Sequence, residues 1–457
     1  MIADKRVSPV ELVELVYERI ERLDGKLNAF LTLNREEATA GAREAEQAVM
    51  NGADLGPLHG VPISVKDLEM TKGLRTTGGS LVYKDRVPEV DSAVVERVRR
   101  SGAIIIGKTN TPEFGLLGHT RNRLGDDCRN PWDTSTTTGG SSGGAGAALA
   151  AGLGPLATGS DGGGSIRIPA SFCGVYGIKP SQGRVPRYAG APGPVSANQT
   201  SQSGPMSRTV LDSALLLRAL AGHDPRDVVS LRDAPGDLAA ATRRDVKGLR
   251  VGLSMDFGYA GVDPEVRDSV EGAAKVFEEL GCSVENADLD LDHPYDTFMT
   301  IFGANSLVAY GALMESNRDD LTDYTRQWLE DGASTTGAQY ASALGMIDRM
   351  KSKLADMHEL YDIVLSPTAA STAFPVGEPP SRIGDVDLDP FFGYVQFTAV
   401  INLIGNPAAS VPCGFSSAGL PIGLHIIGRP RDDATVIAAS AAFERARPWA
   451  DRRPPVS

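Results

Sequence analysis

Two serines and one lysine could together form a nucleophilic centre. Ser141 lies within a Gly-Gly-Ser-Ser-Gly-Gly run, Ser165 ends a Ser-Asp-Gly-Gly-Gly-Ser run, and Lys66 follows the apolar segment 61–65. A serine hydroxyl becomes a useful nucleophile when a base removes its proton, and a lysine can be that base once burial lowers its pKa. These residues predict a serine nucleophile that works without histidine.

The glycine- and serine-rich segment 134–165 allows three other interpretations. A flexible linker is one, but the segment contains the apolar stretch 145–153 and further apolar residues follow it. A phosphate cradle is another, but neither glycine run has the spacing of a nucleotide-binding loop. Ser141 also fits the Gly-x-Ser-x-Gly nucleophile elbow, which requires an apolar strand before the serine, whereas a threonine-rich stretch precedes Ser141. The centre with two serines and a lysine is therefore favoured.

Histidine and cysteine give little support for other chemistry. The six histidines include no His-x-x-x-His pair, so we expect no metal site and no cofactor. His119 could face a pocket, since it follows a Glu-Phe-Gly segment by a few residues. The four cysteines have no disulfide, redox or zinc-ligand spacing, which fits a reducing compartment. Cys173 could be a reactive thiol or, alternatively, a small buried residue.

The composition is that of a globular protein with a large core. The chain has 457 residues, of which 41% are hydrophobic. A formal net charge of −13 disfavours nucleic acid as a direct partner, because phosphate binding requires a basic surface. No apolar signal core follows Met1, and no segment has the length and hydrophobicity of a membrane span. We expect a soluble cytoplasmic protein with no membrane partner.

Short apolar runs that alternate with helical patterns predict the α/β class. Ser8 and Glu11 form a capping-box pattern at the first helix, and a helical N-terminal region extends to about residue 56. The whole pattern predicts a single domain over 1–457, with a mixed β-sheet core covered by helices on both faces. The expected strands are 61–65, 103–106, 155–158, 250–254, 362–366, 408–412 and 422–427, and further helices are expected at 36–50, 92–100, 210–222, 263–280, 339–360 and 432–446.

The segment from about 285 to 395 has the weakest strand signal. Glycine and aspartate interrupt its helical stretches, so we expect a variable helical insertion that forms part of a pocket. A helical layer without a ligand role is the alternative. Seven aromatic residues could line a pocket for aryl groups or could pack in the core: Phe302, Tyr310, Trp328, Tyr340, Phe391, Phe392 and Tyr394.

The chain resembles the amidase signature family in motifs that extend over most of its length. The matching segments are 8–30, 60–67, 107–115, 129–132, 139–180, 203–210, 405–408 and 419–424. Ser141 follows Lys66 by 75 residues and Ser165 follows Ser141 by 24, as in that family. The resemblance implies the amidase signature fold and a homodimer.

The same resemblance implies a role for each residue of the centre. Ser165 would be the nucleophile, Ser141 a bridging serine that follows a cis peptide bond, and Lys66 the base. The backbone N–H donors of an oxyanion hole would come from Gly162, Gly163, Gly164 and Ser165. Apart from the resemblance, we expect Asp161 and Arg167, which flank this loop, to hold it in shape; contact with substrate is the alternative.

Two details of the sequence leave alternatives open. Ser160 stands where that family usually has threonine. Lys66, without the serines, could also be half of a buried ion pair with Asp67.

These features predict an enzyme that hydrolyses linear carbon–nitrogen (amide) bonds through an acyl-serine intermediate. A stand-alone amidase that acts on small aryl or alkyl amides or carbamates, as an arylamidase or urethanase would, is the favoured interpretation. The alternative is the glutaminase subunit of a tRNA-dependent amidotransferase, which requires a pocket for glutamine and a second protein as its partner. A non-catalytic binding protein is disfavoured, because all three catalytic positions are occupied.

Overall fold

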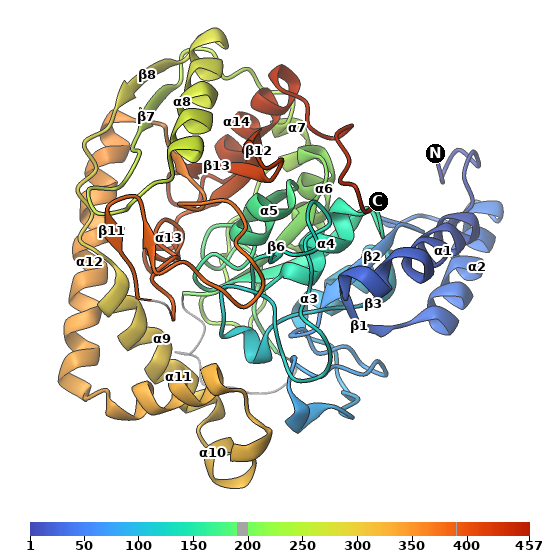
Figure 1. Ribbon diagram of the computed structural model, residues 1–457. Helices are drawn as coiled ribbons and strands as arrows, with labels where there is room; N and C mark the ends of the chain where they lie inside the picture. Colours follow the sequence, from blue (N-terminus) through green and yellow to red (C-terminus); the bar gives the residue numbers. More distant parts are fainter. Residues whose placement is uncertain (190–199, 390) are drawn as a thin grey trace.

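A central sheet of eleven strands organises the chain. The structure is a computed structural model that describes residues 1–189, 200–389 and 391–457. The sheet order is β1-β3-β2-β4-β6-β5-β12-β13-β9-β7-β8, and helices lie on both of its faces (Figure 1). The predicted α/β fold with a mixed, helix-covered sheet is therefore confirmed.

The bounds of the elements follow. The strands of the main sheet are β1 Phe30–Leu33, β2 Pro62–Lys66, β3 Ile104–Thr109, β4 Leu156–Asp161, β5 Tyr176–Lys179, β6 Gln202–Ser207, β7 Arg250–Leu253, β8 Ser283–Asn286, β9 Ile363–Pro367, β12 Ala408–Phe415 and β13 Pro421–Gly428, and β10 Arg382–Ile383 pairs with β11 Val386–Asp387. The α-helices are α1 Pro9–Leu27, α2 Arg35–Met50, α3 Ala93–Arg100, α4 Gly143–Ala150, α5 Arg167–Cys173, α6 Val210–Leu220, α7 Leu238–Ala241, α8 Pro264–Glu279, α9 Tyr295–Tyr310, α10 Leu313–Ser316, α11 Asp323–Ser334, α12 Gly337–Leu360, α13 Ala399–Ile404 and α14 Asp433–Ala446. Short 3-10 turns are η1 Leu81–Tyr83, η2 Glu113–Gly115 and η4 Arg318–Asp320.

Both parallel and antiparallel pairs occur in the sheet. Strand β2 runs parallel to β3 and β4, and β7 runs parallel to β8 and β9. The strands between these two groups, from β6 to β13, pair antiparallel with their neighbours. The carboxyl ends of β2 and β4 therefore lie at the same edge of the sheet, where the chain places Lys66 and Asp161.

The predicted helices and strands with strong signals are present at nearly the predicted positions. The Ser8 hydroxyl caps α1, and the Glu11 side chain closes the capping box on the Ser8 backbone. Several elements that sequence patterns did not predict are short or rich in glycine, such as α4, β5 and β6, whereas α9 and α11 lie within the expected helical insertion without having been predicted individually. Helix α4 contains only glycine, alanine and leucine, so it has no polar face, and all of its residues are buried. Its helical form therefore depends on tertiary packing.

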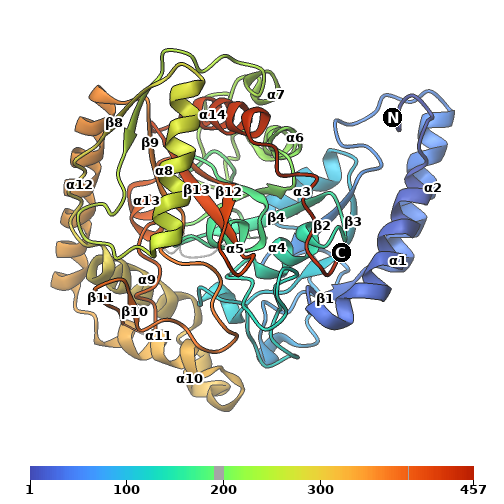
Figure 2. The ribbon, with the colours of Figure 1, turned by 45° about the horizontal axis from the view of Figure 1, so that its top comes forward.

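The segment between β8 and β9 is helical. Helix α9 packs against both α11 and α12, and the three helices form a block beside the sheet, visible in gold and orange in Figure 2. The helical part ends at Leu360, because β9 belongs to the central sheet. The predicted insertion of 285–395 thus includes one core strand, and residue 390 within it lies outside the described residues. Within the described ranges, no helix combines the length and the apolar character needed to cross a membrane.

Candidate active site

Lys66 lies at the end of β2, an interior strand of the sheet, and its side chain is completely buried. Its Nζ atom lies within hydrogen-bond distance of Ser141 Oγ at 2.8 Å, of Ser160 Oγ at 3.0 Å and of the Ser160 carbonyl oxygen at 3.2 Å. No ion pair joins Lys66 to Asp67 in the part of the chain that the structure describes; instead Asp67 accepts the backbone N–H of Thr77. The alternative of a structural Lys66–Asp67 pair is therefore not supported.

The surroundings of Lys66 favour a neutral amine. The pKa of Lys66 is lowered to about 7, and burial is the largest cause. The carboxylates of Asp161 and Glu69 oppose this shift, and the positive charge of Arg187 contributes to it. A large fraction of the lysine is therefore unprotonated near neutral pH, as a base must be.

The hydrogen-bond partners of Lys66 orient that amine. A neutral lysine amine has two N–H bonds and one lone pair. The Ser160 carbonyl oxygen can only accept, and the Ser160 hydroxyl can accept the second N–H. The lone pair is then left for the hydroxyl proton of Ser141, 2.8 Å away. Ser160 thus positions the lysine, a role that its place in the sequence did not indicate.

Ser141 follows a cis peptide bond and is almost fully buried. The bond Gly140–Ser141 is cis, and Ser141 is 2% exposed. The next residue, Ser142, donates its backbone N–H to the Ser165 carbonyl oxygen at 3.0 Å, which ties the two serine segments together. Only isolated bridges precede Ser141, at Thr136 and Thr137, so the strand that a nucleophile elbow requires is missing there.

Ser165 ends the loop that joins β4 to α5. Its side chain is partly exposed and borders the main cavity. The loop requires glycine at position 164, where φ is +128° and a Cβ atom would overlap the Thr398 hydroxyl. The linker interpretation of this segment is wrong, because its residues lie in the core between a sheet strand and a buried helix.

Asp161 and Arg167 hold this loop in place through buried hydrogen bonds. The Asp161 carboxylate accepts the N–H groups of Gly164 at 2.7 Å and Ile166 at 3.1 Å, and it accepts two guanidinium bonds from Arg167 at 2.9 Å each. Neither side chain lines the cavity. Burial alone would raise the pKa of Asp161, but Arg167 outweighs it and keeps that pKa well below its usual range.

The remaining bonds of Arg167 connect the loop to distant strands and helices. Its Nη2 donates to the Thr398 carbonyl oxygen at 3.0 Å and to Asn402 Oδ1 at 2.6 Å, and Nη1 lies 3.0 Å from His425 Nε2. Burial, followed by the charge of Arg167, lowers the pKa of His425 well below its usual value. A neutral His425 can accept the guanidinium hydrogen bond, so the loop rests on a buried network.

Three of the four expected oxyanion donors have no acceptor. The backbone N–H groups of Gly162, Gly163 and Ser165 make no hydrogen bond with the described residues. The Gly164 N–H, in contrast, is taken by Asp161. The candidate oxyanion donors are therefore reduced to the backbone N–H groups of Gly162, Gly163 and Ser165.

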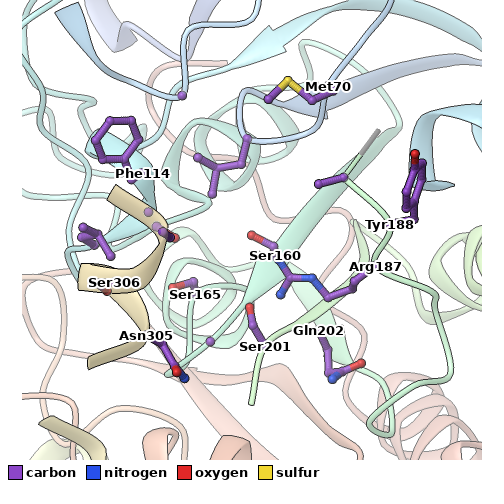
Figure 3. A pocket seen from close by; sticks show the side chains of 18 of the residues that line it. Met70, Phe114, Ser160, Ser165, Arg187, Tyr188, Ser201, Gln202, Asn305 and Ser306 are labelled. Atoms are coloured by element: carbon purple, nitrogen blue, oxygen red, sulfur yellow. The ribbon is translucent and has the colours of Figure 1, made fainter. Parts of the chain in front are cut away.

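A cavity of about 600 Å³ opens over these residues (Figure 3). Ser141, Ser160, Gly162 and Ser165 lie on its wall. Many of the lining residues are apolar or aromatic, among them Leu68, Met70, Tyr83, Phe114, Leu116, Phe302 and Tyr310. A second group of lining residues is polar, and consists of Arg187, Ser201, Gln202, Asn305 and Ser306.

Of the seven aromatic residues that could line a pocket or pack in the core, two line the cavity and five pack elsewhere. Phe302 and Tyr310 line the cavity, and both come from α9. The other five lie outside the cavity wall: Trp328, Phe391 and Phe392 pack on one another, Tyr340 bonds to Asn305, and Tyr394 bonds to His119. Phe114 and Tyr83 line the cavity and were missed, because nothing in their sequence context separates lining from packing.

Other residues considered for chemistry lie away from the centre. His119 is buried beside Tyr394 and does not line the cavity, and burial lowers its pKa to about 4. Cys173 is buried in α5, and burial raises the pKa of its thiol well above the usual value, so it is the small core residue rather than a reactive thiol. The described residues contain no group of three or more histidines, cysteines or carboxylates that could hold a metal ion.

Comparison with known proteins identifies the family. The model of the Amidase family matches residues 11–437, so this chain belongs to the amidase family. An acylamidase from Rhodococcus erythropolis is 38% identical, with 99% of this chain and 95% of that protein covered. A glutamyl-tRNA(Gln) amidotransferase component from Moorella thermoacetica is 39% identical, with 98% and 96% covered.

A solved structure agrees with this assignment. The crystal structure of a bacterial aryl acylamidase of the amidase signature family has 35% sequence identity and a TM-score of 0.92, with 98% of this chain and 95% of that chain covered. The resemblance seen in the motifs, the fold and the class of enzyme, an amidase, are thereby confirmed.

Proposed function

We propose that this chain is a stand-alone amidase that hydrolyses small linear amides through an acyl-Ser165 intermediate. The observation that carries the proposal is the placement of a buried, neutral-tending Lys66 within 2.8 Å of Ser141, on the wall of the cavity that Ser165 borders. The cavity volume suits a small-molecule amide.

In the first half of the reaction, Ser165 Oγ bonds to the carbonyl carbon of the amide. The Ser165 proton passes to Ser141, whose own proton passes to the Lys66 amine. The carbon–nitrogen bond then breaks with its electron pair on nitrogen, which receives a proton from Ser141 while Lys66 returns one to Ser141. The amine leaves, and the acyl group stays on Ser165.

Water completes the reaction by the same route. It gives a proton through Ser141 to Lys66 as its oxygen bonds to the acyl carbon, and the ester bond to Ser165 breaks. The carboxylic acid leaves and Ser165 regains its proton. In both halves, the N–H groups of Gly162, Gly163 and Ser165 stabilise the negative oxygen, and one such donor is typically worth about 100- to 1000-fold in rate.

The acylamidase relative and the aryl acylamidase structure favour small acyl amides of aryl or alkyl amines as substrates. Carbamates suit the same nucleophile. The glutaminase subunit of an amidotransferase remains the second candidate, because the glutamyl-tRNA(Gln) amidotransferase relative is equally similar in sequence. A cytoplasmic location and a homodimer complete the proposal.

Labelling with a fluorophosphonate tests the nucleophile. Trypsin releases the peptide 130–167, which contains both serines, so fragmentation must locate the adduct. We expect label on Ser165 in the wild type and none in Ser165→Ala. Label on Ser141 in both proteins would contradict the proposal.

A second assay separates the two candidate functions. Release of amine from acetanilide by the purified chain alone supports the stand-alone amidase. Ammonia release from glutamine only after a partner is added would support the amidotransferase role.

A further inference from the structure

Arg187 carries a guanidinium that lacks a partner inside the cavity. Its side chain extends from the wall beside Tyr188 toward Ser160 and Ser165 (Figure 3). The Nη1 atom is buried and has no hydrogen-bond partner in the described ranges. Burial is the main cause that lowers the pKa of Arg187, a sign of the cost of desolvating this cation.

The carboxylates near Arg187 are engaged by other groups. Glu69 accepts the hydroxyls of Ser203 at 2.9 Å and Ser92 at 2.7 Å. Asp227 accepts two backbone N–H groups, including that of Arg187 itself at 2.9 Å, but no guanidinium bond. Both residues act on the Arg187 guanidinium only as charges at a distance.

Two other arginines line the cavity and differ from Arg187. Arg226 donates to the carboxylates of Glu96 at 2.6 Å and Asp224 at 2.8 Å, so its charge is paired. Arg86 stacks on the Tyr83 ring at 4.2 Å and donates to the Thr76 carbonyl oxygen. Arg187 is thus the arginine of this wall whose guanidinium lacks a bond to any described residue.

We infer that the acyl part of the preferred substrate carries a carboxylate that binds Arg187. A carboxylate is the acceptor that matches a guanidinium best, because two parallel charge-assisted hydrogen bonds can form. We assign the carboxylate to the acyl part because Arg187 is directed toward Ser165, which bonds to the acyl carbon, and the apolar lining residues then suit the amine part. The substrate class is then the half-amide of a dicarboxylic acid, including its anilides. This inference rests on the proposed amidase function.

Matched anilides test the inference. We compare kcat/KM for the succinyl and the butyryl 4-nitroanilide, which differ in one carboxylate, and expect the wild type to prefer the succinyl compound. Arg187→Gln should reduce the succinyl-to-butyryl ratio by roughly 10- to 100-fold, the usual value of hydrogen bonds to a charged group. Arg187→Lys should keep part of the ratio. Any effect of Arg187 on the pKa of Lys66 cancels in the succinyl-to-butyryl ratio of kcat/KM, because the same base acts on both substrates.

Arg226→Gln is the matched control, because the charge of Arg226 is already paired, and its ratio should equal that of the wild type. An Arg187→Gln ratio that is also unchanged would overturn the inference while the amidase function stands. A carboxylate preference that depends on Arg187 but appears only on the amine side, for 4-acetamidobenzoate over acetanilide, would overturn the acyl placement. If neither anilide reacts and Ser165 takes no fluorophosphonate, the proposed function itself fails, and the inference with it.

Discussion

The Nζ atom of Lys66 lies within hydrogen-bond distance, 2.8 Å, of the Oγ atom of Ser141, inside the protein. The parallel pairing of β2 with β4 brings the end of β2 beside the loop that follows β4, and the bond from the Ser142 N–H to the Ser165 carbonyl oxygen holds the segment of Ser141 against that loop. Since a base must be unprotonated, the pKa of Lys66 connects this contact to the pH dependence of the reaction.

Replacement of Lys66 by alanine should lower kcat/KM by about 100- to 10,000-fold, the usual contribution of a general base. With a Lys66 pKa of about 7, the wild-type rate should rise with pH through neutrality as the amine loses its proton. The loss should be smaller at alkaline pH, where hydroxide partly replaces the base. Profiles of kcat/KM from pH 5.5 to 10 measure this, and an equal loss at every pH would make Lys66 a structural residue.

Removal of the Ser160 hydroxyl should weaken the orientation of Lys66. Ser160→Ala loses the 3.0 Å hydrogen bond to Nζ but keeps the backbone carbonyl contact. We expect kcat to fall about 3- to 10-fold, as for one hydrogen bond of ordinary strength. Ser160→Thr keeps the hydroxyl and should restore the rate. Equal kcat values for the alanine and threonine variants would show that the hydroxyl does not position the lysine.

Sequence patterns singled out the two candidate serines and the candidate lysine because each stands in a motif whose spacing carries information. Ser160 and Arg187 could not be found in that way. Ser160 reaches Lys66 through the pairing of β2 with β4, and Arg187 becomes notable only because its guanidinium lacks a partner in three dimensions. Likewise, Gly164 was predicted as an oxyanion donor, but the local fold of the loop gives its N–H to Asp161.

The same limit applies to the fold. Long amphipathic elements such as α1 and α8 were predicted because their own sequences contain caps and apolar faces. Helix α4 and strand β6 contain glycine and proline, and the surrounding core stabilises them. The packing of α9, α11 and the segment near 391 decides which of their aromatic residues line the cavity. No local sequence pattern predicts that packing.

Lys66 should lower the stability of the folded protein near neutral pH. Its pKa is about 7 in the folded state against 10.5 for a free side chain, so between these values the unfolded state binds a proton that the folded state does not. Stability therefore rises with pH across this window, and the penalty disappears above it. Lys66→Met removes the penalty, so the difference in unfolding free energy between variant and wild type should favour the variant most near pH 7 and decline toward pH 10.

Denaturant titrations at pH 7, 8.5 and 10 measure this difference. The hydrogen bonds lost with the lysine change the difference in unfolding free energy by the same amount at each pH. The slope of that difference with pH is therefore the diagnostic quantity. A difference that stays constant with pH would show that the Lys66 pKa is not lowered by folding.

Arg187 should also set the pH at which the enzyme becomes active. Its positive charge lowers the pKa of Lys66, so Arg187→Gln raises that pKa and moves the acidic limb of the rate profile to higher pH. The butyryl 4-nitroanilide is the substrate for this measurement, because it lacks a carboxylate for Arg187. Arg226→Gln, whose paired charge is not among the influences on Lys66, should leave the limb in place. A limb that does not move in Arg187→Gln would contradict the coupling.

Loss of the Asp161 charge should damage both the loop and the whole fold. The Asp161–Arg167 pair is fully buried at 2.9 Å, and Asp161→Asn leaves the Arg167 cation without its partner. Breaking such a pair typically costs about 3–5 kcal/mol of unfolding free energy. The carboxylate also accepts the Gly164 and Ile166 N–H groups, so kcat should fall as well.

Glu21→Gln, which breaks an exposed pair with Arg35, should cost no more than about 1 kcal/mol. Denaturant midpoints of the two variants, measured side by side, check this, and similar midpoints would mean that Asp161 does not hold the loop.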